Sequence, residues 1–317
     1  MKTEDILGLF GGLALFLYGM NMMSEGLEEL AGGQLETILE KLTNHKIKAI
    51  MIGMLLTCVM QSSSAMTVML IGFVNAKLMS LKRAIWVVMG ANIGTTITGQ
   101  MIALKLGTIA PVLAIVGVVM IVFFTQQTIQ RYGEIITGIG MLFMGLNIMA
   151  QSMIPLQTSV TFLHFMMALS NPLLAVFAGT ILTAIIQSSS ASIGILQTLA
   201  MQGLVPFSQA VYFLMGFDIG TCMTAFLASL SGNRNAKRLA LFHLLFNVMG
   251  TSFFMTICLV TPIISFVASW TPCEPMRQIA NMHTLFNVVT VVIFIGIDRL
   301  ILKLIYKLCP DKPIKKY

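Results

Sequence analysis

Five residues, Gln61-Ser-Ser-Ser-Ala65, occur a second time as Gln187-Ser-Ser-Ser-Ala191, 126 positions further along the chain, and both copies lie inside long apolar stretches. Amide and hydroxyl groups in such a stretch cost free energy unless they bind one another or a ligand. Their oxygens and hydrogens can contact anions and cations alike. The repeated motif therefore indicates an ion-binding site made of two related parts.

The composition indicates an integral membrane protein. Of its 317 residues, 57% are hydrophobic and only 10% are charged, whereas soluble domains carry about 25% charged residues. The apolar runs are long and continuous, which favours helices over a β-barrel, whose strands alternate in polarity. We therefore predict an all-α protein in the lipid bilayer. The formal charge of +7 fits basic loops that orient the chain, and we expect no nucleic-acid partner.

Apolar segments occupy residues 6–23, 47–76, 83–104, 107–124, 133–151, 171–203, 208–230, 239–262 and 281–303. The two segments that contain the motif, 47–76 and 171–203, are longer than the roughly 20 residues of one membrane span. Each is expected to form two half-helices that meet at a polar break. The break would be either a re-entrant hairpin or a tight pair of helices.

The similarity between the two halves extends beyond the motif without gaps. Met89–Thr95 aligns with Met215–Thr221 at the same offset, and Asp218 stands where the first half has Asn92. Glycines and polar residues that stay in register over this length predict an internal duplication. The predicted domains are a first repeat at 1–130, a second repeat at 131–262, and an additional C-terminal transmembrane helix with a basic cytoplasmic tail at 263–317.

The basic residues predict an orientation. If each motif segment enters and leaves the membrane on one side, a single face holds all of the 19 lysines and arginines except Lys2, Lys105 and Arg277. The positive-inside rule makes that face cytoplasmic. We expect a multi-pass protein of the cell membrane with its C-terminus in the cytoplasm. Residues 6–23 and their counterpart 133–151 then run in opposite directions, which predicts inverted-topology repeats.

Lysine and arginine are absent from the middle of the spans, so an anion would be bound by hydroxyls, amides and the N–H groups of half-helix N-termini. Carbonyls at the opposite half-helix ends suit Na⁺, which would also neutralise the anion during its passage. The candidate ion-binding residues of the two motifs are Gln61, Ser62, Ser63, Ser64, Gln187, Ser188, Ser189 and Ser190. The further candidate sodium ligands are Asn92, Thr95, Asp218 and Thr221. We expect sodium as the only metal, with no transition metal and no cofactor.

Other interpretations of these residues remain open. Small polar residues also pack membrane helices against one another, and Asp218 can be a hydrogen-bonded structural acid. The pattern His-x-Leu-Phe-Asn occurs at 243–247 and at 283–287, and we interpret each histidine as a packed or helix-end residue. The serine tracts have no positioned base, which argues against an enzyme.

The duplicated motif, the Gly-x-Asn/Asp-Ile-Gly-Thr runs at 90–95 and 216–221, and His243-Leu-Leu-Phe-Asn247 resemble the type II sodium-dependent phosphate cotransporter family, over residues 5–260. The resemblance implies transport of inorganic phosphate coupled to Na⁺, and it assigns both Gln-Ser-Ser-Ser tracts to a shared phosphate and sodium site. Asp218 departs from the asparagine that is usual in the family. The large loop of the eukaryotic members is missing, and we expect no PhoU-like C-terminal domain.

Three classes of function are compatible with the sequence. The first is a secondary transporter that couples inorganic phosphate to the Na⁺ gradient by alternating access, and its variants are a symporter for another oxyanion or one driven by H⁺. The second is a passive anion channel. The third is a signalling or scaffold membrane protein. A homo-oligomer is compatible with each of them.

Overall fold

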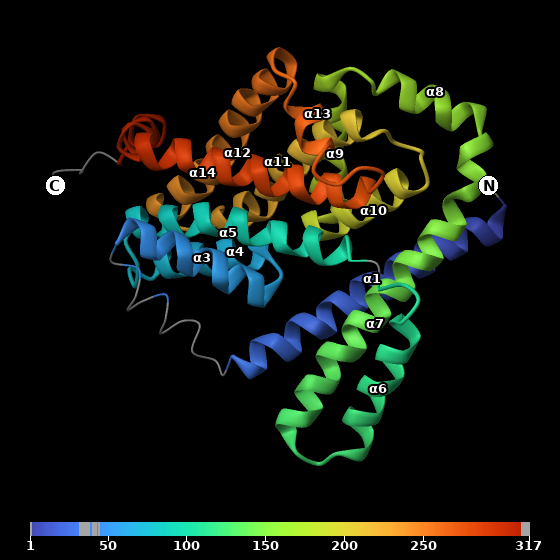
Figure 1. Ribbon diagram of the computed structural model, residues 1–317. Coiled ribbons are helices and arrows are strands. Elements are labelled where there is room, and N and C mark those ends of the chain that lie inside the picture. Colours follow the sequence, from blue (N-terminus) through green and yellow to red (C-terminus); the bar gives the residue numbers. More distant parts are fainter. Residues whose placement is uncertain (1, 32–38, 40–42, 44, 105, 312–317) are drawn as a thin grey trace.

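The computed structural model describes residues 2–31, 39, 43, 45–104 and 106–311, and every regular element within these ranges is a helix (Figure 1). The all-α prediction is therefore confirmed. The helices in chain order are α1 (Thr3–Leu30), α3 (Lys46–Met60), α4 (Ser63–Asn75), α5 (Leu81–Ile102), α6 (Ala110–Phe123), α7 (Gln127–Met153), the 3-10 helix η1 (Ile154–Thr158), α8 (Val160–Ala168), α9 (Pro172–Ile186), α10 (Ser189–Met201), α11 (Phe207–Ser229), α12 (Arg234–Val260), α13 (Ile263–Ala268) and α14 (Pro275–Leu308).

Several helices are suited to a bilayer. Among the described residues, four helical stretches are long and apolar enough to cross a membrane, namely α1, Gln127–Thr158, α11 and α12. Helices α8 and α9 form a pair bent by 110°, which makes a fifth crossing if the pair counts as one broken span. This arrangement agrees with the multi-pass membrane protein that the composition predicts.

Both long motif-containing segments are interrupted at the motif. Helix α3 ends at Met60 and α4 begins at Ser63, while α9 ends at Ile186 and α10 begins at Ser189. The glutamine in each break is left-handed, with φ of 50° at residue 61 and 57° at residue 187. A left-handed residue ends a helix, and the serine that follows it caps the next one. The same local sequence thus stops and restarts a helix at both places.

Glycines bring the helices of each half into close contact. Helix α3 packs on α5, and α9 packs on α11. A methyl group on Gly90 would lie 1.9 Å from the Ile50 carbonyl oxygen, and one on Gly216 would lie 2.1 Å from that of Val176. These two contacts are the same distance apart in sequence as the two motifs. Small residues at such crossings let membrane helices touch along their backbones.

We expect Gly90→Ala to destabilise the protein by about 2–3 kcal/mol, because the added methyl group must push α3 away from α5. Gly72→Ala in α4 is the matched control, since nothing lies within 4 Å of a methyl group there. Thermal unfolding of both variants in detergent measures the difference. Equal melting temperatures for the two variants would show that the α3–α5 contact is looser than described.

Helices α1 and α7 cross side by side, with α6 next to α7 (Figure 1). A methyl group on Gly12 would lie 2.8 Å from the Gly145 carbonyl oxygen, and one on Gly138 would lie 2.5 Å from that of Gly19. Gly12 with Gly138, and Gly19 with Gly145, are equivalent positions of the two halves. The helices are antiparallel, and exchanging the halves reproduces the same contact. Positions 126 residues apart therefore make reciprocal contacts where α1 crosses α7.

Helices α12 and α14 also make reciprocal contacts. Helix α12 packs on α11, α5 and α4, and α14 packs on the equivalent helices α5, α11 and α10. The rings of Phe246 and Phe294 lie 4.7 Å apart, and those of Phe254 and Phe286 lie 5.2 Å apart. Residues 246 and 286 are as far apart in sequence as 254 and 294, so these ring pairs are also equivalent. Helix α14 thus holds the position relative to one half that α12 holds relative to the other.

Candidate functional site

The first motif is anchored by side-chain hydrogen bonds. Gln61 is buried, its Nε2 donates to the Cys58 carbonyl, and its Oε1 accepts from the Thr98 hydroxyl of α5 at 2.8 Å. Ser62 Oγ accepts from the backbone N–H of Ala65 at 3.1 Å. The glutamine therefore ties the break to α5, and the serine caps the N-terminus of α4.

The first turn of α4 carries donors that are not used elsewhere. Ser63 is buried, and its carbonyl accepts from the Thr67 hydroxyl. Ser64 is half-buried. Neither of these serine hydroxyls bonds another described residue, and the first N–H groups of a helix have no acceptor within that helix. Hydroxyl and amide donors thus meet where the helix dipole is positive, an arrangement that suits an anion.

The second motif repeats this geometry with one difference. Ser188 Oγ accepts from the backbone N–H of Ala191 at 3.2 Å, and Ser189 and Ser190 are buried. Gln187, however, is exposed, and its side chain forms no hydrogen bond with the described residues. The two breaks thus share backbone geometry and capping but differ in whether the glutamine is held.

A threonine one turn before each glutamine shows the same kind of difference. Thr183 Oγ1 donates to Ser192 Oγ at 2.8 Å. In the first half Met66 stands in place of that serine, and Thr57 Oγ1 is buried without a partner among the described residues. An unpaired buried hydroxyl costs about 1–3 kcal/mol. Thr57 is therefore a candidate ligand that the sequence analysis did not select, although its alignment with Thr183 was visible.

The candidate sodium ligands Asn92 and Asp218 lie in equivalent buried networks. Asn92 Nδ2 donates to Asn247 Oδ1 of α12 at 2.8 Å. Asp218 Oδ2 accepts from Asn287 Nδ2 of α14 at 2.8 Å, and His283 Nε2 lies 3.2 Å from its Oδ1. Asn92 thus bonds an asparagine of α12, and Asp218 bonds an asparagine of α14.

His283 is another residue that the sequence analysis did not assign to the site. It is fully buried within α14, which agrees with the packing interpretation, and it also contacts Asp218. The shared His-x-Leu-Phe-Asn pattern was the available signal. Its meaning depends on which helix α14 faces, and only the fold provides that information.

The remaining candidate ligands, Thr95 and Thr221, are hydrogen-bonded within their own helices. Their hydroxyls donate to the carbonyls of Ala91 at 3.1 Å and Phe217 at 2.9 Å. The hydroxyl lone pairs stay available for a cation. Helix α4 packs on α11 and α10 packs on α5, so each motif helix contacts the long helix of the other half. No hydrogen bond among the described residues joins the two motifs directly.

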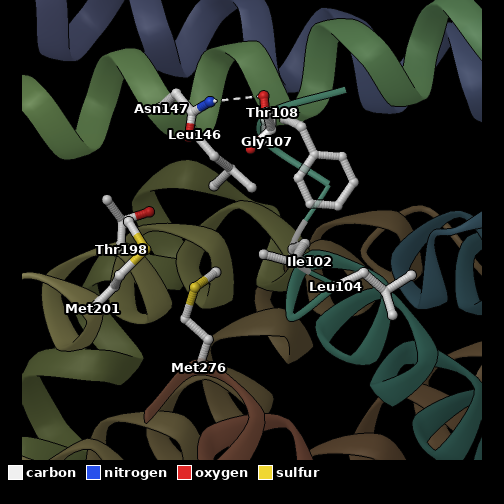
Figure 2. Close-up of a pocket in the computed structure, with 10 residues that line it drawn as sticks. Ile102, Leu104, Gly107, Thr108, Leu146, Asn147, Thr198, Met201 and Met276 are labelled. Carbon is white, nitrogen blue, oxygen red and sulfur yellow. Dashed lines mark hydrogen bonds between the residues drawn. The ribbon is translucent and has the colours of Figure 1, made fainter. Parts of the chain in front are cut away.

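A cavity of about 330 Å³ lies where the ends of α5 and α10 meet α7 (Figure 2). Asn147 Nδ2 donates to the Gly107 carbonyl at 3.3 Å on its wall. The other lining residues are Ile102, Leu104, Thr108, Phe143, Leu146, Thr198, Met201 and Met276. No motif residue lines this cavity, which borders the end of α10 that is remote from its serines.

Comparison with known proteins finds a matching family and several relatives. A family model described as Na⁺/Pi-cotransporter matches residues 15–151 and 158–298. The "Uncharacterized protein YqeW" of Bacillus subtilis is 37% identical over 244 residues, which cover 76% of this chain and 78% of that protein. The "Putative inorganic phosphate export protein YjbB" of Escherichia coli K12 is 28% identical over 247 residues, 78% of this chain but 46% of YjbB. The "Sodium-dependent phosphate transport protein 2B" of Homo sapiens is 32% identical over 99 residues, which cover 30% of this chain and 14% of that protein. No solved structure matches.

Proposed function

The chain belongs to the Na⁺/Pi-cotransporter family, and from that membership we propose that it is a secondary transporter coupling inorganic phosphate to the Na⁺ gradient. The observation that carries the proposal is the pair of breaks at 61–64 and 187–190. In each, a left-handed glutamine precedes a serine-capped helix N-terminus. The family is one of transporters, and the apolar helices fit a multi-pass membrane protein.

Phosphate is proposed to bind at the serine tracts Ser62–Ser64 and Ser188–Ser190. Hydroxyls and first-turn N–H groups can donate to its oxygens, and the positive ends of the α4 and α10 dipoles favour negative charge. Within the described residues, no lysine or arginine takes part in either break. Binding by neutral donors is weaker than binding by a fixed cation, which suits a site that must also release its substrate.

Sodium is proposed to bind beside the glutamines. The carbonyl end of α3, Gln61 Oε1 and the unpaired Thr57 hydroxyl offer the oxygen ligands that alkali cations use. Gln187 is the corresponding residue of the second half. The further proposed sodium ligands are Asn92, Thr95, Asp218 and Thr221. A cation at these places would reduce the cost of moving an anion through a medium of low dielectric.

The two halves are proposed to be inverted repeats that work by alternating access. The symmetric glycine contact between antiparallel α1 and α7 supports this, because a two-fold axis relating antiparallel spans lies in the membrane plane. Gln61 is buried and bonded while Gln187 is exposed, so the halves differ in state. Exchange of these states between the halves would move access to the opposite side.

The proposal predicts Na⁺-dependent accumulation of ³²P-phosphate in proteoliposomes that contain the purified chain. An inward Na⁺ gradient should drive uptake, while a matched K⁺ gradient or a Na⁺ ionophore should abolish it. Flux down a phosphate gradient without Na⁺ would instead favour a channel. Loading the vesicles with phosphate and reversing the Na⁺ gradient tests the export direction named for YjbB.

A further inference from the structure

A polar cavity of about 470 Å³ lies away from both motifs, where the end of α4, the start of α12 and the end of α14 meet. Its lining residues are Lys77, Asn233, Arg234, Asn235, Arg238, Tyr306 and Asp311. These residues supply three cationic side chains and one carboxylate. The cavity is therefore positively charged, unlike the neutral breaks at the motifs.

Arg238 is the fixed cation of this cavity. Its side chain is buried, and its Nη2 donates to Asp311 Oδ1 at 2.8 Å. Nε donates to the Cys309 carbonyl and Nη1 to Asn235 Oδ1, while the guanidinium lies 4.1 Å from the Tyr306 ring centroid. Asp311, by contrast, is 77% exposed. The guanidinium thus holds the Asp311 carboxylate, and this exposed side chain could leave without breaking apolar packing.

Lys77 and Arg234 bring further positive charge without a carboxylate partner among the described residues. Lys77 has a left-handed backbone, with φ of 63°. The equivalent residue of the other half is Gly203, with φ of 70°. A side chain in that conformation costs about 1 kcal/mol or more. The chain therefore tolerates strain to place a lysine at the cavity where glycine serves elsewhere, and such strain tends to occur at functional sites.

The cavity is connected to the motif helix α4. Asn233 caps α12 by accepting from the N–H groups of Asn235 and Ala236. Its own backbone N–H donates to Asn75 Oδ1, at the end of α4, at 2.8 Å. A ligand that bridges the cavity would therefore hold the end of α4 against α12 and α14.

We propose that this cavity binds a phosphate group that replaces Asp311 on Arg238 and pairs with Lys77 and Arg234. Once Asp311 has left, Arg238 Nη2 can donate to a phosphate oxygen. Lys77 and Arg234, which have no carboxylate partner among the described residues, can offset the larger negative charge of the phosphate. The phosphate group is either inorganic phosphate or the headgroup of an anionic lipid. The site is separate from the proposed transport site, and it goes beyond the transport function proposed above.

The test is equilibrium binding of ³²P-phosphate to the full chain in phosphatidylcholine nanodiscs and Na⁺-free buffer. A Ser64→Ala/Ser190→Ala background weakens the phosphate sites proposed at the motifs, and neither of these hydroxyls bonds another described residue. Lys77→Gly and Arg234→Gln should each weaken binding on the order of tenfold. Asp311→Asn should strengthen binding because it removes the competing carboxylate. Lys237→Gln, on α12 but outside the cavity, is the matched control and should leave binding unchanged. Lys77→Gly relieves backbone strain, so its melting temperature should not fall.

A second arm identifies the source of the phosphate group. Nanodiscs that contain phosphatidylglycerol should leave the binding of free phosphate intact if inorganic phosphate is the ligand. If a headgroup is the ligand, phosphatidylglycerol should compete with phosphate, and native mass spectrometry should show lipid retention that Lys77→Gly abolishes. Phosphate and lipid binding that both stay the same in Lys77→Gly and Arg234→Gln would overturn the proposal. Absence of Na⁺-driven transport by the wild-type chain would contradict the proposed function and leave the cavity proposal standing.

Discussion

Gln187→Ala is expected to lower Na⁺-driven phosphate transport by roughly 10- to 100-fold while the protein stays folded. A hydrogen bond to an ion contributes about 1.5–3 kcal/mol, which corresponds to this loss in affinity. The side chain is exposed and forms no hydrogen bond with the described residues. Alanine should therefore remove a ligand without breaking a structural contact. Uptake of ³²P-phosphate at sub-saturating Na⁺ tests the loss of transport, and the melting temperature tests whether the protein stays folded.

The matched variant is Gln61→Ala, at the equivalent position. There the glutamine bonds the Cys58 carbonyl and the Thr98 hydroxyl, so we expect the same loss of transport together with a loss of stability of about 1–3 kcal/mol. The comparison separates binding from folding, because only Gln61 of the two glutamines bonds other described residues through its side chain. Wild-type uptake by Gln187→Ala would show that Gln187 does not bind the transported ions.

The breaks in the two long segments could be predicted from the sequence, but the difference between them could not. Adjacent polar residues inside an apolar run indicate an interruption wherever they occur, because a continuous helix would expose them to lipid. Gln61 and Gln187 are identical in type, and the same Ser-Ser-Ser-Ala follows each of them. Their burial differs because it depends on how other helices pack around each break, and the residue types at the break do not contain that information.

The position of α14 was also beyond the sequence analysis. No segment aligns with it at the spacing of the two motifs, so we placed residues 263–317 outside the repeats. Its His-x-Leu-Phe-Asn pattern matches α12 at a different spacing, and in the fold α14 packs on α5 and α11 as α12 packs on α11 and α5. The residues that contact Asp218 come from this helix. A partner set by such packing is visible only in three dimensions.

Asp218→Asn is expected to weaken the apparent Na⁺ affinity of transport by about tenfold, with a smaller effect on the maximal rate. The carboxylate is buried, accepts from Asn287 Nδ2, and lies 3.2 Å from His283 Nε2. Asp218 occupies the position that Asn92 occupies in the first half. A cation near the carboxylate would therefore gain a charge interaction that the amide of Asn92 cannot supply. The Na⁺ dependence of phosphate uptake at saturating phosphate measures the effect.

The alternative is that Asp218 only joins α11 to α14, and Asn287→Ala distinguishes the two roles. That variant removes the hydrogen bond at 2.8 Å but keeps the carboxylate. If Asp218 binds Na⁺, the asparagine variant should lose Na⁺ affinity while Asn287→Ala mainly lowers the melting temperature. If the acid is structural, both variants should be less stable and share the wild-type Na⁺ dependence. The second result would remove Asp218 from the proposed sodium site, because a ligand of the cation cannot be replaced without changing the Na⁺ dependence.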